Sequence, residues 1–171
     1  MARLFVAVWP PPAVVDALVA LPRERQPRLR WTTEDQWHVT LGFLGEADEA
    51  DAATALDTVV HPAVTATLGP ALHHLGAGAL VFPVSGLDSV AAAVAGATSG
   101  VGTSDPERVF RGHLTLARVK DRARVIPAHL EFIAAWLVTA VTLVRSNLHR
   151  DGARYDVVHS VALIEQSSPQ S

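Results

Sequence analysis

The sequence predicts an α+β protein built from two similar halves, and three observations support this fold class. Strand-like and helix-like segments are mixed within 171 residues, and 49% of these residues are hydrophobic, which is enough for a sizeable core. Each half also holds a helix and one strand that carries a histidine, which suggests a loose duplication. We therefore expect a single bilobal domain over residues 1–165 and a disordered tail over 166–171.

Apolar runs separated by proline and glycine define the elements of the first half. Val14, Leu18 and Leu21 fall on one face of a helix that follows the prolines at 10–12. The predicted order is a strand over 3–9, that helix, a basic loop over 22–30, a strand over 37–44 and a helix from 46 to about 60.

The second half repeats the mixture of strands and helices. Its predicted order is strands over 65–74 and 79–84, a helix over 87–97, a loop over 96–108, a strand over 113–119, a helix over 127–136, and final strands over 137–148 and 155–165. The turn "RDGAR" at 150–154 joins the last two strands.

The absence of cysteine excludes disulfides, thiolate metal sites and a cysteine nucleophile. It suits a reducing compartment, and we expect a cytoplasmic, monomeric protein. No stretch has the uninterrupted apolar length that a membrane helix requires, and prolines interrupt the apolar run near the N-terminus, which argues against a signal peptide. Catalysis would have to use His, Asp, Glu, Ser, Thr or Arg.

The net charge of -3 conceals a segregation of charge along the chain. No Lys or Arg occurs from Trp31 to Glu107, and all 14 basic residues lie over 3–30 or 108–154. An anionic substrate would therefore draw its charge partners from these two regions. The arginines of the loop over 22–30 are ordinarily solvated, but this segregation makes them plausible contacts for an RNA backbone.

A short motif, His-apolar-Thr-Leu, occurs twice, at residues 38–41 and 113–116. Side chains two apart in a strand share a face, so His38 and Thr40 point together, as do His113 and Thr115. A single histidine in an apolar strand is usually a packed core residue with satisfied nitrogens. The repeated context favours a functional pair instead, whereas the other six histidines carry no such signal.

Two such strands facing one groove would bring two imidazoles and two hydroxyls around a space the size of a phosphate. One neutral ring can take a proton from a nucleophile while the other, protonated, gives one to a leaving oxygen. The threonine hydroxyls can donate hydrogen bonds to phosphoryl oxygens, and Arg118 can add a positive charge. A zinc site is not expected, because neither motif supplies two ligands at a recognised spacing.

The sequence resembles the 2H phosphoesterase superfamily, and most closely its RNA 2′,3′-cyclic phosphodiesterase family, also known as 2′-5′ RNA ligase. The matching stretches are "RLFVAVWPP", "WHVTLGFLGE", "FRGHLTLARV" and "LVRSNLHRDGARYDVV", in the order of the family. The resemblance implies the 2H phosphoesterase (LigT-like) fold, with two similar lobes of antiparallel sheet flanking a central cleft. It also implies opening of an RNA terminal 2′,3′-cyclic phosphate to a 2′-phosphomonoester without metal or other cofactor.

Carried over to this sequence, the resemblance makes His38 and His113 the acid and base, and favours His38 as the acid. Thr40 and Thr115 would contact the phosphate, Arg118 would be the basic residue of the second motif, and Phe43 an aromatic residue able to stack on the terminal base. Gly112 departs from the proline that often precedes the second histidine, and residues 78–86 lack the tryptophan that many relatives have there.

Two alternatives to this RNA phosphodiesterase remain. The first is a 2H phosphodiesterase for a small ester, such as a cyclic nucleotide or an ADP-ribose cyclic phosphate. The second is a non-catalytic module that binds RNA ends. Ligation of 2′-5′ linkages is the reverse of the phosphodiesterase reaction, and the sequence does not say whether it has a biological role.

Overall fold

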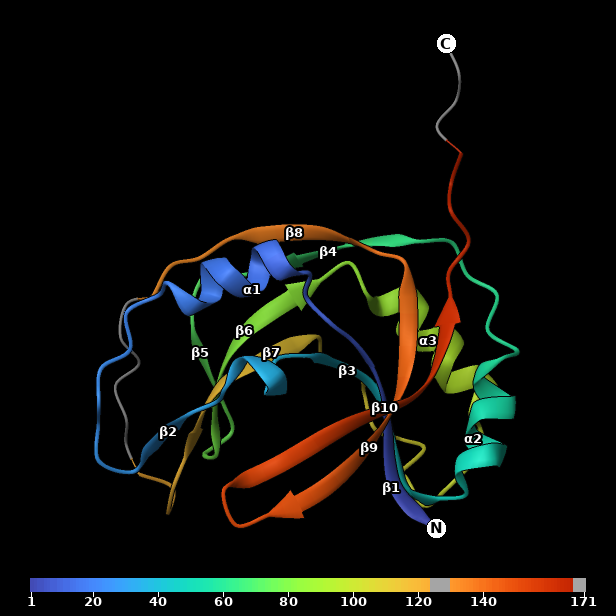
Figure 1. Cartoon of the computed structure of the whole chain (residues 1–171), viewed down its shortest axis with the longest axis horizontal. Coiled ribbons are helices and arrows are strands. Elements are labelled where there is room, and N and C mark those ends of the chain that lie inside the picture. Colours follow the sequence, from blue (N-terminus) through green and yellow to red (C-terminus); the bar gives the residue numbers. More distant parts are fainter. Residues whose placement is uncertain (124–129, 168–171) are drawn as a thin grey trace.

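The computed structural model describes residues 1–123 and 130–167, which form an α+β fold around one curled antiparallel sheet (Figure 1). The elements of the first half are β1 (Ala2–Val8), α1 (Pro12–Val19), β2 (Leu29–Trp31), a 3-10 helix η1 (Glu34–Gln36), β3 (Val39–Ala47) and α2 (Glu49–Leu56). Those of the second half are β4 (Val64–Leu68), β5 (His73–Leu75), β6 (Ala79–Ser85), α3 (Asp88–Ala97), β7 (His113–Val119), β8 (Ala134–Val138), β9 (Ala140–His149) and β10 (Gly152–Ala162).

The two histidine motifs belong to neighbouring strands at the middle of the sheet. The strand order is β10-β9-β1-β3-β7-β6-β4-β8, with β2 paired to β7 and β5 paired to β6. The two central strands β3 and β7 share a single register pair, Val39 with Leu114. Four strands therefore lie on the His38 side of this junction, and six on the His113 side when β2 and β5 are included. The predicted α+β class with antiparallel sheet is confirmed.

The alternation predicted for the two motifs is confirmed by burial. Val39, Leu41, Leu114 and Leu116 are buried in the core, whereas His38, Thr40, His113 and Thr115 are only half-buried. The strand predicted over 113–119 has the bounds of β7. Helix α3 packs against β3. The two elements are close at Gly42, where an added Cβ would lie 3.7 Å from Val94 Cγ1 of the helix.

The helix predicted over 127–136 is wrong wherever the structure describes it. Residues 127–129 lie outside the described residues, Glu131 forms an isolated bridge with Ala71, and Ala134–Val138 is β8. Every residue of β8 pairs with β4, and Trp136 and Val138 alternate inward while their neighbours point outward. The segment is apolar on both faces, so its period of two was not visible in the sequence.

Two further differences concern strands. The strand predicted over 65–74 is two strands, β4 and β5, interrupted at Gly69 and Pro70, because Gly69 has a φ of 110° and proline cannot donate to the ladder. The loop predicted over 22–30 ends in β2, whose Leu29, Arg30 and Trp31 pair with β7. Of the predicted tail, residues 166–167 have no regular structure and 168–171 lie outside the described residues.

Within residues 1–123 and 130–167, no helix is long and apolar enough to cross a membrane.

Candidate functional site

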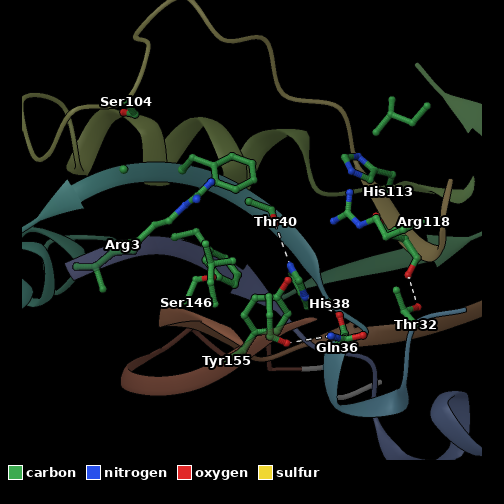
Figure 2. A pocket seen from close by; sticks show the side chains of 18 of the residues that line it. Arg3, Thr32, Gln36, His38, Thr40, Ser104, His113, Arg118, Ser146 and Tyr155 are labelled. Atoms are coloured by element: carbon green, nitrogen blue, oxygen red, sulfur yellow. Dashed lines mark hydrogen bonds between the residues drawn. The ribbon is translucent and has the colours of Figure 1, made fainter. Parts of the chain in front are cut away.

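A pocket of about 570 Å³ opens between β3 and β7 and brings both motifs together (Figure 2). All six residues singled out in the sequence line it: His38, Thr40, Phe43, His113, Thr115 and Arg118. The remaining lining comes from β1, from β2 and η1 and the residue Thr32 between them, and from β3, β5, the loop before β7 and the β9–β10 hairpin. These additional residues are Arg3, Leu4, Phe5, Arg30, Thr32, Gln36, Gly45, Leu75, Ser104, Asp105, Arg108, Ser146, Leu148, Ala153 and Tyr155.

The two histidine rings are held in the same way. His38 Nδ1 lies 2.8 Å from the carbonyl oxygen of Gln36, and His113 Nδ1 lies 2.7 Å from that of Arg111, in each case two residues earlier. A carbonyl oxygen can only accept, so Nδ1 carries the hydrogen in both rings. Nε2 is therefore the nitrogen available for proton transfer, and Thr40 Oγ1 lies 3.1 Å from His38 Nε2.

A β-bulge follows the threonine in each motif. In the pairing of β1 with β3, Ala7 is opposite Thr40 and Val6 is opposite Gly42, which leaves Leu41 as the extra residue. In the pairing of β6 with β7, Val81 is opposite Thr115 and Leu80 opposite Ala117, which leaves Leu116 as the extra residue. The two bulges thus occupy equivalent positions of the two motifs.

These bulges decide which side chains reach the pocket. Phe43 and Arg118 each lie five residues after a histidine, and in a regular strand that odd spacing would point them to the opposite face. One extra residue reverses the alternation, so Phe43 returns to the face of Thr40, and Arg118 to that of Thr115. The spacing of the motif therefore includes a residue that shifts the register.

His38 is surrounded by aromatic rings. The centroids of Phe5, Trp9 and Tyr155 lie 5.0, 5.3 and 4.9 Å from that of the imidazole, and the Tyr155 ring meets it edge-on. Burial among these rings, with smaller contributions from Arg118 and His113, lowers the pKa of His38 from 6.5 to about 4, although the hydrogen bond to Gln36 acts in the opposite direction. His38 is therefore neutral at pH 7.

Phe43 and Arg108 form a stacked pair at the pocket wall. Phe43 is 38% exposed, and the guanidinium carbon of Arg108 lies 4.2 Å from the centre of its ring. The loop that carries Arg108 is fastened to the end of β3 by Thr103, whose amide donates to the carbonyl of Leu44 and whose hydroxyl accepts from the amide of Glu46. One face of the ring predicted for base stacking thus carries a guanidinium, and the side chain is still partly exposed.

The arginines of the loop over 22–30 differ in what their side chains contact. Arg30 lines the pocket, and its guanidinium donates to the carbonyl of Asp151 at 2.8 Å. Arg23 instead donates to the carbonyls of Leu18 and Val19 at the end of α1, Arg28 pairs with Asp121, and Arg25 does not line the pocket. Of these four arginines, Arg30 is the one that lines the pocket.

Two residues beside His38 were not singled out in the sequence. Tyr155 is the single tyrosine of the chain, and it reaches His38 because β10 and β9 lie beside β1 in the sheet. Trp9 is half-buried, contacts His38, and donates from Nε1 to Thr142 Oγ1 at 2.9 Å. Within the described part of the chain, no three His, Asp or Glu side chains gather in an arrangement that could hold a metal ion.

Residues 8–65 match the family model described as LigT like Phosphoesterase. TT0787 of Thermus thermophilus is 24% identical, with a TM-score of 0.78 over 94% of this chain and 97% of that one. E. coli LigT in complex with NADP+ is 26% identical, with a TM-score of 0.76 over 95% and 98%, and LigT has also been solved with 3′-AMP. No curated protein matches significantly. The chain is thus similar to LigT-like phosphoesterases in the sequence of residues 8–65 and in its fold.

Proposed function

We propose that this protein is a metal-independent RNA 2′,3′-cyclic phosphodiesterase that produces a 2′-phosphomonoester. The match of residues 8–65 to a phosphoesterase family model supports phosphodiesterase activity, and the RNA end is the finer part of the proposal. The observation that carries it is the convergence of two His-Thr pairs in one pocket, each ring fixed through Nδ1 with Nε2 available.

In the proposed reaction, one histidine takes a proton from water as the water oxygen bonds to phosphorus. The bond from phosphorus to the 3′ oxygen breaks, and the other histidine gives that oxygen its proton. The Thr40 and Thr115 hydroxyls and the Arg118 guanidinium stabilise the charge that builds on the non-bridging oxygens. Strain in the five-membered cyclic phosphate lowers the demand on the catalyst, so acid and base groups suffice.

The protonation of His38 bears on the division of roles. A pKa of about 4 leaves its Nε2 as an acceptor at pH 7, which is the state that a general base requires. The acid role implied by the family resemblance requires the bound phosphate anion to raise this pKa, because a negative charge beside the ring favours the imidazolium. Substrate binding would then cause His38 to take up a proton.

Two kinds of ligand in related structures support a nucleotide substrate. E. coli LigT has been solved with NADP+ and with 3′-AMP, and both ligands combine a base, a ribose and phosphate. In this protein the same pocket combines an exposed aromatic ring with four lining arginines, Arg3, Arg30, Arg108 and Arg118. An aromatic surface beside cationic groups suits a base and its phosphates.

The test is incubation of the purified protein with EDTA and an RNA that ends in a 2′,3′-cyclic phosphate. We expect turnover to a 2′-monoester, and a loss of about 10² to 10⁴ in rate for each of His38→Ala and His113→Ala, with folding retained. Near-normal activity in either variant would rule out the paired mechanism. Binding without turnover would favour the RNA-end module, and turnover of small cyclic esters alone would favour the first alternative.

The acid can be identified with a substrate whose leaving 3′ oxygen is replaced by sulfur. A thiolate leaves without protonation, so the variant that lacks the acid should regain most of its rate on this substrate, whereas the variant that lacks the base should not. Rescue of His38→Ala alone would assign the acid role to His38. Rescue of His113→Ala alone would reverse the assignment.

A further inference from the structure

The pocket holds more positive charge than one cyclic phosphate requires. Arg118 lies with His113 at one end of the view in Figure 2, and Arg3 lies with Ser146 at the other, with His38 between them. Among the described residues, none of the four lining arginines makes an ion pair with a carboxylate. Arg118 accounts for the reacting phosphate, and Arg3 is left without an assigned partner.

The position of Arg3 follows from the register of β1. Arg3, Phe5 and Ala7 alternate on one face of this strand, and their partners on β3 are Glu46, Phe43 and Thr40. Along this pair of strands the pocket therefore presents the Thr40 hydroxyl, then the Phe43 ring, and then the Arg3 guanidinium. Arg3 lies four residues from Ala7, which is roughly 13 Å along the strand.

The acidic side chains around Arg3 are engaged elsewhere or out of reach. The Asp48 carboxylate caps α2 by accepting from the amide of Asp51, and Glu49 pairs with Arg145 at 3.1 Å. Glu46 is the cross-strand neighbour of Arg3, but the two side chains do not come within ion-pairing distance. Arg3 is exposed, lines the pocket and keeps its positive charge available.

The Ser146 hydroxyl completes this end of the pocket. Leu4 pairs with Arg145, so Ser146 follows on β9 at the level of Arg3, and it pairs with Tyr155 on β10. Arg3 and Ser146 line both the main pocket and a second hollow, which Asn147 also lines. A guanidinium and a hydroxyl therefore lie together at this end of the pocket.

We propose that Arg3 and Ser146 bind a second phosphate, the one on the 5′ side of the nucleotide whose cyclic phosphate reacts. The order of groups along this pair of strands matches that nucleotide: cyclic phosphate at the histidines, base at Phe43 and 5′-phosphate at Arg3. This inference rests on the proposed function for the orientation of the nucleotide. It identifies the preferred substrate as one with a phosphate on both sides of the ribose.

Binding of product-like ligands tests the subsite without any turnover. Calorimetry compares adenosine 2′-monophosphate with adenosine 2′,5′-bisphosphate on the whole protein. We expect the bisphosphate to bind about tenfold more tightly, and Arg3→Met to remove this advantage while Arg3→Lys keeps part of it. Arg25→Met is the matched control, since Arg25 is an exposed arginine outside the pocket and its loss should leave the ratio unchanged.

Turnover extends the test to the reaction. The substrates are adenosine 2′,3′-cyclic phosphate, its 5′-phosphorylated form and the dinucleotide with the same cyclic end. The latter two should share a higher kcat/KM that falls with salt and is lost in Arg3→Met. Equal binding of the two adenosine phosphates, or an advantage that survives Arg3→Met, overturns the subsite. A protein that binds the bisphosphate preferentially but turns over none of the substrates retains the subsite and loses the proposed function.

Discussion

His38 sits in an environment unlike that of an ordinary surface histidine. Phe5 and Trp9 approach it from β1 and the residue after it, Tyr155 from β10, and the charged or titratable groups His113 and Arg118 face it from β7. The rings displace water from the imidazole and so disfavour its charged form, and the Arg118 guanidinium acts in the same direction. The pKa of this one side chain is thus set by residues from three parts of the sheet.

Tyr155 supplies one of these rings, and Tyr155→Leu should expose a face of the imidazole. We expect the pKa of His38 to rise from about 4 toward 6.5, so that the neutral fraction at pH 6 falls. Tyr155→Phe keeps the ring and should keep the low value. NMR titration of the His38 ring resonances measures both, and equal midpoints in Tyr155→Leu and the wild type would show that Tyr155 does not shield the imidazole.

At the scale of elements, strand alternation alone predicted the facing of four of the six residues singled out in the sequence. His38, Thr40, His113 and Thr115 could be placed on common faces because each pair is two residues apart. The same rule puts Phe43 and Arg118 on the wrong face, and only the bulges at Leu41 and Leu116 correct it. The strand register depends on the partner strand, which the sequence of the motif does not contain.

The tip of the β9–β10 hairpin is a second feature that local sequence could not reveal. Arg30 donates to the carbonyl of Asp151, and the Gln36 side chain donates to that of Ala153 at 2.9 Å. The carbonyl of Gln36 is also the acceptor for His38 Nδ1. The hairpin is therefore tied to the residue that orients the catalytic candidate His38.

Gly152 permits this close approach, so Gly152→Ala should displace the hairpin tip. Its φ is 121°, and an alanine Cβ would collide with the Arg30 guanidinium and lie 3.2 Å from Gln36 Nε2. We expect kcat on the cyclic phosphate to fall about 10- to 100-fold through misorientation of His38. Gly100→Ala is the control, since it too has a positive φ but free space around its Cβ. Matching kcat values for the two variants would refute the role of the hairpin tip.

At the scale of the whole molecule, the pocket gathers charges that are far apart in the chain. The lining arginines at positions 3, 30, 108 and 118 all come from the two basic regions of the sequence, as the charge segregation predicted. Which basic residues would reach the pocket depended on the strand order, in particular on β1 lying next to β3 and β2 next to β7. The fold thus converts two separate basic regions into one cationic pocket.

The buried, neutral state of His38 also makes the stability of the whole fold depend on pH. The unfolded chain takes up a proton near pH 6.5 but the folded chain only near pH 4, so the folded state loses about 3 kcal/mol as pH falls from 7 to 4. This contribution is fully present above pH 6.5 and does not fall further below pH 4. In His38→Asn the loss through this group should vanish, although the variant is less stable at pH 7 because the ring contacts are gone. Urea unfolding of both proteins at pH 7 and pH 4 measures the difference, and identical pH dependence would show that His38 is not held neutral by the fold.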